Sequence, residues 1–295
     1  MNPADATAPG GRASDAGQPG ASESFIGFDS AWTDNPRAPG AIAALVVASD
    51  GTVTFHPPRL ARFAEALAFI DEVATGYTLI ALDQPTIVRN AAGMRPAERV
   101  AAAAISWLGG GVQPASRSKT GMFCDAAPIW PFLAALGAAD DPMAARAASN
   151  GRHVMEVFPA LAIPAFDAGC AARKAAAKYN PANPRFRPDD WCRVARAAAA
   201  QFDRWHLAEP ACWCRDAAAL PRPRKADQDR LDAMLCLAIA LHWRLAPSAE
   251  SIMIGDLDDG YIVAPLAPAL QDRLTAAAAL RGVAIDGRPA AVSGR

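Results

Sequence analysis

Two short apolar runs in this chain each end on an aspartate. Residues 25–28 (FIGF) precede Asp29, and residues 79–82 (LIAL) precede Asp83. A carboxylate at the end of a buried strand is costly to desolvate. Two of them side by side repel each other unless a cation lies between them. The repeated pattern therefore indicates a site for a divalent metal ion.

Further carboxylates stand beside apolar residues in two other segments. Asp229 and Asp232 are three residues apart, which places both on one face of a helix near its first turn. Residues 233–241 are almost wholly apolar, so this helix must be buried. Glu156 lies inside the strand-like run 153–158 (HVMEVF). Magnesium and manganese prefer oxygen ligands, and two such ions can hold the attacking and leaving oxygens of phosphodiester hydrolysis.

Each carboxylate also has an ordinary structural explanation. Asp229 and Asp232 are suited to helix capping and to interaction with the helix dipole, and taken alone that explanation is favoured. Asp83 precedes a proline by two residues and is a common turn former. Glu156 could pair with an arginine such as Arg152. The metal interpretation is preferred for the set, because three different elements each place a carboxylate beside apolar residues.

The strands that would carry these side chains follow an α/β pattern. Three strands come first, and the later strands are separated by helices. This order differs from that of a doubly wound dinucleotide-binding fold, which alternates from the start. Gly27 is also isolated, so it forms no glycine-rich fingerprint. The predicted strands span residues 24–29, 41–48, 52–55, 77–83, 153–158 and 261–264.

Helical periodicity and terminal signals define the predicted helices. They span residues 60–73, 96–108, 128–136, 189–202, 227–245 and 268–281. Residues 164–188 and 206–224 are predicted to be irregular, and connections this long are usually functional or disordered. We therefore expect one domain over 23–285 with an insertion around 160–224. Residues 1–22 and 286–295 are expected to be tails.

Composition limits the classes of function. The 295 residues carry a formal net charge of −1, so any contact with nucleic acid must be local. No run of eighteen apolar residues predicts a transmembrane helix. Residues 1–22 have no apolar core typical of a signal peptide, which favours a cytoplasmic protein with six reduced cysteines. The Cys212-Trp213-Cys214 segment is a poor zinc motif and is interpreted as two small residues in a turn.

The order of these motifs resembles the ribonuclease H-like fold, a mixed five-stranded sheet flanked by helices. The late helix with its Asp-x-x-Asp-Ala pattern is similar to the Holliday-junction resolvase branch of that fold. Three segments resemble the DUF429 family of predicted nucleases: 83–85 (DQP), 156–159 (EVFP) and 229–234 (DRLDAM). The resemblance covers roughly residues 24–285 as ordered blocks.

The resemblance implies a specific site. Asp29, Asp83 and Asp232 would converge as catalytic metal ligands, with Asp229 or Glu156 as a fourth ligand. The cofactor would be Mg²⁺ or Mn²⁺. The implied activity is hydrolysis of phosphodiester bonds in DNA or RNA by a metal-activated water, without a covalent intermediate.

Basic residues could hold the nucleic acid near this site. Arg95 and Arg99 are four residues apart at the start of the predicted helix and are expected to share one of its faces. Arg117 and Lys119 lie in the next loop. All four are predicted nucleic-acid contacts, although ordinary solvated charges explain each cluster equally well. Trp32 could stack on a base or cover a strand end, and covering is the favoured interpretation.

Two other functions are consistent with parts of the sequence. The first is a non-catalytic ribonuclease H-like scaffold that binds nucleic acid or a protein partner. The second is an actin-like kinase or ATPase, which is disfavoured because residues 30–33 (SAWT) lack a glycine for a phosphate loop. The sequence indicates neither the preferred nucleic acid nor the oligomeric state.

Overall fold

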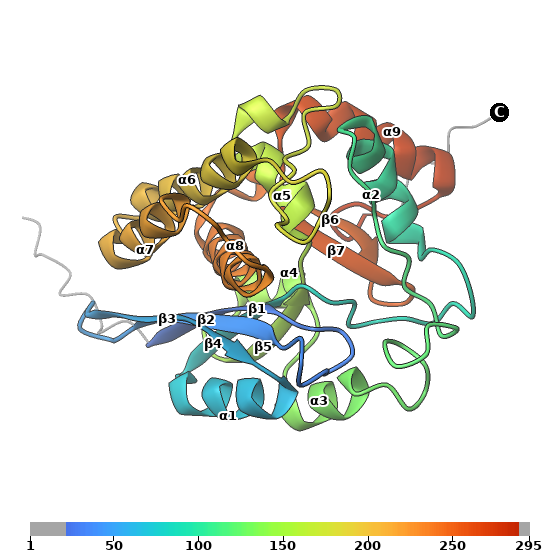
Figure 1. Ribbon diagram of the computed structural model, residues 1–295. Helices are drawn as coiled ribbons and strands as arrows, with labels where there is room; N and C mark the ends of the chain where they lie inside the picture. The colour runs from blue at the N-terminus through green and yellow to red at the C-terminus, as the bar shows by residue number, and fades with distance from the viewer. Residues whose placement is uncertain (1–21, 289–295) are drawn as a thin grey trace, which may run out of the picture.

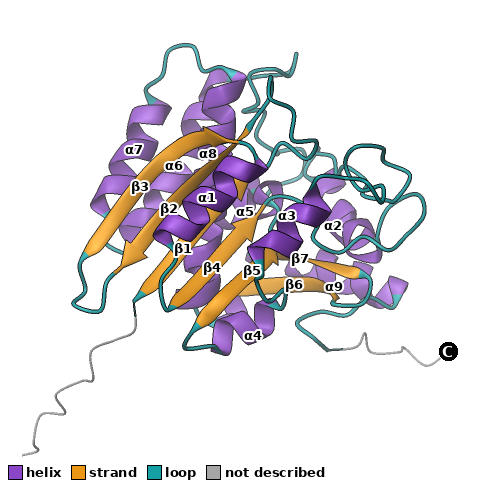
Figure 2. Ribbon diagram, turned by 90° about the horizontal axis from the view of Figure 1, so that it is seen from below, coloured by secondary structure: helices purple, strands orange, loops and turns teal. Residues whose placement is uncertain are grey.

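A five-stranded mixed sheet forms the centre of the protein. The computed structural model describes residues 22–288, so the predicted tails lie almost wholly outside it. The strand order is β3-β2-β1-β4-β5, seen side by side in Figure 2. β1 pairs antiparallel with β2 and parallel with β4, β2 pairs antiparallel with β3, and β4 pairs parallel with β5. The strands are β1 (Glu23–Asp29), β2 (Gly40–Val47), β3 (Val53–Ala61), β4 (Tyr77–Leu82) and β5 (Gly151–Glu156).

Helices cover both faces of this sheet, as predicted. α1 (Phe63–Val73) and α3 (Ile129–Leu136) lie on one face, and α8 (Lys225–Leu245) crosses the other (Figure 1). α8 packs so closely that a Cβ atom at Gly27 of β1 would overlap backbone atoms of Ala233 and Leu237. The first residues of α8 are thereby held near the end of β1. A mixed α/β fold with helices on both sides is confirmed.

Additional elements build an outer layer and a second, smaller core. The two-stranded sheet β6–β7 packs with α2 and α9 around its own buried cluster. An isolated bridge between Val157 and Val263 joins it to the end of the main sheet. The remaining helices are α2 (Pro96–Trp107), α4 (Pro142–Ala147), α5 (Pro159–Phe166), α6 (Pro188–Arg204), α7 (Ala208–Ala218) and α9 (Pro268–Arg281). The strands of the small sheet are β6 (Ser251–Asp256) and β7 (Gly260–Pro265), and short 3₁₀ turns lie at Ala168–Cys170 and Ser248–Glu250.

The third strand is longer than predicted. β3 continues through Pro57 and Pro58 to Ala61, and the following helix begins at Phe63. Leu60, expected in the first helical turn, is therefore a strand residue. Prolines are tolerated here because β3 is the edge strand, where some backbone N–H groups have no ladder partner.

The prediction that residues 206–224 are irregular was wrong, because α7 occupies most of this segment. Its buried positions are the small residues Pro210, Ala211, Cys214 and Ala217, which give only a weak apolar pattern. The Cys-Trp-Cys segment therefore lies on a helix and not in a turn. All six cysteines of the protein are free thiols in the structure.

Other differences concern short elements. α4, α5 and β6 were not predicted, and residues 286–288 join the fold instead of a tail. The Asp286 side chain accepts a hydrogen bond of 2.7 Å from the Met253 backbone N–H. Between residues 22 and 288, none of the helices combines the length and apolar character needed to span a bilayer.

Candidate acidic site

Four aspartates line one cavity of about 550 Å³ at the carboxyl ends of two inner strands of the main sheet. Asp29 ends β1, and Asp83 directly follows β4. The Asp83 backbone N–H donates to the Phe28 carbonyl at 2.9 Å, so the parallel pairing of β1 and β4 continues to the site. α8 supplies Asp229 and Asp232 from the other side. The structure thus brings together the four aspartates that the sequence singled out.

Asp232 is held by two neutral donors. The Tyr179 hydroxyl donates to its Oδ1 at 2.7 Å, and the Gln228 side-chain N–H donates to its Oδ2 at 2.5 Å. Gln228 precedes Asp232 by one helical turn, so spacing alone could have suggested that contact. Tyr179 comes from the irregular segment between α5 and α6, and the sequence gives no signal for its position. These donors fix the orientation of the carboxylate.

Lys225 is the basic residue of α8 that contacts the acidic site. Its ammonium forms an ion pair with the Asp229 carboxylate, one turn further along the helix. The Lys225 side chain is half-exposed, whereas Asp229 is largely buried. Arg37, from the loop after β1, also lines the cavity. Positive charge is therefore present at the rim, above the carboxylates.

The cavity concentrates negative charge. Burial, followed by repulsion from Asp232 and Asp83, raises the pKa of Asp29 well above its ordinary value. Burial, followed by repulsion from Asp232 and Glu156, does the same to the pKa of Asp83. The pKa of Asp232 is raised to about 6, chiefly by burial, although Tyr179 and Lys225 oppose the shift.

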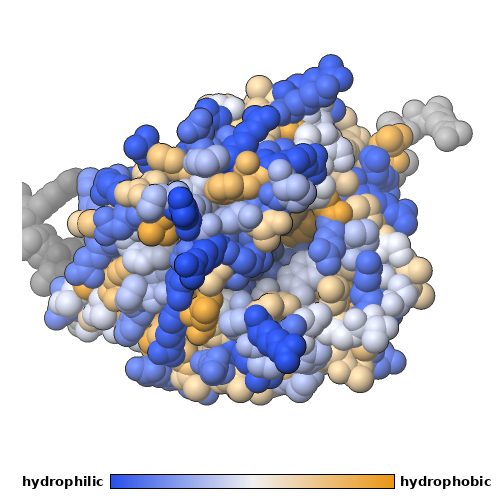
Figure 3. Space-filling view, in the orientation of Figure 1, coloured by the Kyte–Doolittle hydropathy of each residue, from blue (hydrophilic) through white to orange (hydrophobic). Residues whose placement is uncertain are grey.

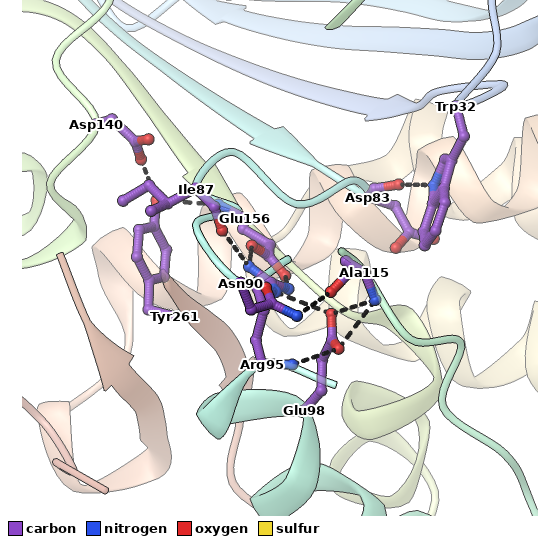
Figure 4. Close-up of polar contacts among 10 residues, drawn as sticks. All are labelled: Trp32, Asp83, Ile87, Asn90, Arg95, Glu98, Ala115, Asp140, Glu156 and Tyr261. Atoms are coloured by element: carbon purple, nitrogen blue, oxygen red, sulfur yellow. Dashed lines mark hydrogen bonds and ion pairs between the residues drawn. The ribbon is translucent and has the colours of Figure 1, made fainter. Parts of the chain in front are cut away.

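Glu156 lies outside the cavity of the aspartates. It ends β5 and is 3 % exposed, and both carboxylate oxygens accept from the Arg95 guanidinium, at 2.7 and 2.5 Å. Arg95 also donates to Glu98 at 2.8 Å (Figure 4). The alternative explanation of Glu156, pairing with an arginine, is confirmed, but the partner is Arg95, and Arg152 contacts Asp71 at 2.8 Å. Glu156 is therefore engaged in a buried ion pair and does not line the cavity of the four aspartates, although it is close enough to Asp83 to raise the pKa of that carboxyl.

The structure also corrects the role expected for Arg95. Arg95 precedes α2 as its N-cap residue, so it does not share a helix face with Arg99. Its side chain is 1 % exposed, and the guanidinium is bound by Glu156 and Glu98. A guanidinium enclosed in this way is not available to contact nucleic acid, whereas Arg99 is exposed.

The loop 112–127 borders the cavity. Gln113 and Met122 contribute to its lining. In the same loop Lys119 is half-buried, and the Arg117 guanidinium lies 4.4 Å from the centre of the Trp130 ring. Hydrophilic residues cover most of the face shown in Figure 3, with hydrophobic residues scattered in small groups. Gln113 and Met122 are therefore the residues of this loop that reach the cavity, whereas Arg117 and Lys119 are not part of its lining.

The donor set suits a hard divalent cation, but the side chains are not gathered for one. Within residues 22–288, no three His, Cys, Asp or Glu side chains come close enough together to hold a metal ion. Asp229 and Asp232 face internal donors, while the Asp29 and Asp83 carboxylates accept no hydrogen bond from the described residues. Binding an ion through three aspartates would require side-chain rotation at the α8 pair.

The fold and site define an α/β protein with a carboxylate-lined cavity where two parallel strands end. The family model described as "Protein of unknown function (DUF429)" matches residues 27–253. The chain belongs to this family, and the matched region contains all four aspartates of the cavity. No curated protein and no solved structure matches the chain.

Proposed function

We propose that this protein is a metal-dependent nuclease that hydrolyses phosphodiester bonds of DNA or RNA. The observation that carries the proposal is the convergence of Asp29, Asp83 and Asp232 in one cavity. They come from two adjacent strand ends and from a helix packed across the same sheet. Each pKa is raised, which means that the negative charge is incompletely balanced. A divalent cation would supply that balance.

We further propose that the main sheet is of the ribonuclease H-like type. Three antiparallel strands followed by two parallel strands, in the order 3-2-1-4-5, support this assignment. So does the position of α8, which lies over β1 and brings Asp232 toward Asp29. The resemblance of the DQP and DRLDAM segments to predicted nucleases points in the same direction.

The residues of the cavity would have different roles in hydrolysis. Bound Mg²⁺ or Mn²⁺ would activate water and balance the charge on the phosphate. Asp29 and Asp83 would hold the ion, and Asp232 would complete the ligands after its carboxylate rotates away from Tyr179 and Gln228. Lys225 and Arg37 would bind the phosphate from the rim. Water adds to phosphorus as one P–O bond breaks, which leaves a phosphomonoester and an alcohol.

Cleavage assays with single-stranded and duplex DNA and RNA test the proposal. We expect cleavage that depends on added Mn²⁺ or Mg²⁺ and falls at least about a hundredfold in Asp29→Asn. Asp272→Asn is the matched control, because Asp272 is exposed on α9, away from the cavity. Equal cleavage by wild type and Asp29→Asn would contradict the assignment.

A second candidate is a non-catalytic scaffold that binds nucleic acid or a protein. It is favoured by one observation: Lys225, Tyr179 and Gln228 already satisfy the two carboxylates of α8. Thermal melting with millimolar Mn²⁺ separates the candidates. The nuclease should be stabilised by the ion in wild type and much less in Asp29→Asn. Equal melting temperatures with and without the ion would favour the scaffold.

A further inference from the structure

A second cavity of about 200 Å³ adjoins the acidic one. Trp32, Asp83 and Gln113 line both cavities, so the two spaces meet at these residues. Figure 4 shows the Trp32 indole beside Asp83, with the Arg95 network extending away from them. A molecule bound at the aspartates could therefore extend into the second cavity without leaving the protein surface.

The size and lining of the second cavity suit a flat ring. A cavity of about 150 Å³ holds a benzene molecule, so 200 Å³ admits a somewhat larger heteroaromatic ring. Its apolar wall comes from the β4–α2 loop, loop 112–127, the start of α5 and strand β7. The apolar side chains are Pro85, Val112, Phe158 and Ile262.

Charge distinguishes the two cavities. The second contains Arg95, but that guanidinium is bound to both Glu156 and Glu98. With Asp83 at the shared boundary, the second cavity has a net negative lining and disfavours a phosphate. The acidic cavity instead has Lys225 and Arg37 at its rim. A ligand with an anionic part and a neutral ring would bind in a single orientation across the boundary.

The backbone of Trp32 is held in an unusual conformation. Its φ of +54° lies in the left-handed region, which is rare and strained for a bulky residue. The indole N–H donates to the Asp83 carbonyl at 2.8 Å, and the ring packs edge-on against Phe123 at 5.3 Å. Such strain is often found at ligand-binding sites. Here it places the indole at the boundary between the two cavities.

We propose that the second cavity binds the nucleobase next to the phosphate held at the aspartates, with the Trp32 indole stacking on that base. This inference rests on the proposed nuclease function and assigns it a single-stranded or locally unpaired substrate. Aromatic stacking tolerates any base, since every base has a π-face. The sequence favoured Trp32 as a cover over a strand end. Under this proposal, Trp32 contacts the substrate directly.

The experiment compares two oligomers of equal length and phosphate number: a single-stranded oligonucleotide and an all-abasic strand. Fluorescence anisotropy with the full-length Asp29→Asn protein measures both affinities without cleavage. We expect the base-bearing strand to bind at least about tenfold more tightly. Trp32→Ala, and Val112→Trp, which fills the cavity, should reduce this preference to less than about twofold. Asp272→Asn, on the exposed surface of α9, should retain it.

The outcomes separate this inference from the function on which it rests. Equal binding of both strands to the parent protein overturns the base site, and so does a preference that survives Trp32→Ala and Val112→Trp. In either case, Asp29-dependent cleavage by the wild-type protein can still support the nuclease. Binding of neither strand overturns the base site, and absence of cleavage by wild type then overturns the nuclease. Melting temperatures of all variants check that they are folded.

Discussion

At the scale of single residues, the acidic cavity shows a conflict between charge and burial. Asp29 and Asp83 each end a strand whose preceding side chains are buried. Neither carboxylate has a cationic hydrogen-bond partner among the described residues, and the pKa of each is raised. Of the three carboxylates, Asp232 is the best stabilised, because two protein groups donate hydrogen bonds to it. The metal-free site should therefore destabilise the fold at neutral pH.

This conflict predicts a pH dependence of stability. An acid whose pKa is raised by folding binds protons more readily in the folded state, so stability falls as pH rises from the unfolded to the folded pKa. For Asp232 this window runs from 3.8 to about 6. We expect Asp29→Asn to melt higher than wild type at pH 7 without metal, by on the order of 1 kcal/mol or about 2–4 °C. Near pH 4 the difference should vanish.

Differential scanning fluorimetry in the presence of a chelator measures this difference. Asp272→Asn, which changes an exposed carboxylate on α9, should melt like wild type at both pH values. An Asp29→Asn protein that is less stable than wild type at pH 7 would show that the carboxylate makes a favourable contact in the metal-free state.

The buried Arg95 is a second residue with a large expected effect. Arg95→Ala leaves Glu98 and Glu156 without their partner, and breaking a buried ion pair from one side costs about 3–5 kcal/mol. Burial already raises the pKa of Glu156 to about 7 despite the opposing effect of Arg95. Protonation below that pH should therefore recover part of the loss. Urea unfolding at pH 5.5 and 8 measures it.

Arg152→Ala is the control for that experiment. Its partner Asp71 is largely exposed, and surface pairs contribute about 0–1 kcal/mol. Similar losses in the two variants would mean that the Arg95 network is more hydrated than its burial indicates.

At the scale of elements, the contact of α8 with β1 determines the site. Gly27 lets the α8 backbone rest on the strand, and this contact sets how far Asp232 lies from Asp29. The sequence shows Gly27 as an isolated glycine, with nothing to identify its partner 206 positions further along. By contrast, the apolar run of α8 and the strand pattern of β1 are local signals, and both elements were predicted within a few residues.

Gly27→Ala should disrupt this packing. The added Cβ would overlap the Ala233 carbonyl and the Leu237 backbone nitrogen, which are main-chain atoms that cannot move away separately. We expect a loss of at least about 3 kcal/mol, beyond the usual 1–3 kcal/mol of overpacking. Gly111→Ala is the control, since a Cβ there meets no atom within 4 Å. Chemical unfolding measures both; equal stability would mean that α8 shifts without cost.

Elements without a strong local signal were missed for physical reasons. α7 buries mainly small side chains, and α5 contains Pro164 in its interior. β6 is stabilised by pairing with β7 and lies after a short turn. In the site itself, Tyr179 contacts Asp232 across 53 positions of the sequence, and Arg95 contacts Glu156 across 61 positions. Such contacts follow from the tertiary fold, whereas carboxylates at the ends of apolar strands can be recognised from sequence.

At the scale of the whole molecule, the net charge of −1 leaves no general attraction for nucleic acid. Under the proposed function, binding of nucleic acid would depend on a few cations near the cavity, including Lys225 and Arg37 at its rim. Arg117 and Lys119 belong to the loop that borders it. Affinity should then decrease with salt in proportion to the small number of phosphates contacted.

The Arg117→Ala, Lys119→Ala double variant tests this directly. Each phosphate contact to a single strand contributes about −0.7 to the slope of log affinity against log salt. Losing two contacts should reduce the steepness of the slope by about 1.4, with weaker binding at low salt. Arg281→Ala, at the end of α9, is the control. An unchanged slope would place the nucleic acid away from loop 112–127.

Both borders of the main sheet carry features that oppose strand addition. In the edge strand β3, Pro57 and Pro58 have no backbone N–H and lie where the register with β2 shifts. On the outer side of β5, the Ala139 carbonyl accepts from the Val154 N–H at 3.0 Å, and Val157 bridges to Val263. Exposed edges are templates on which further chains pair and aggregate. A protein protected in this way should stay dispersed when concentrated, and Pro57→Thr with Pro58→Val should open one border to self-templated fibre growth.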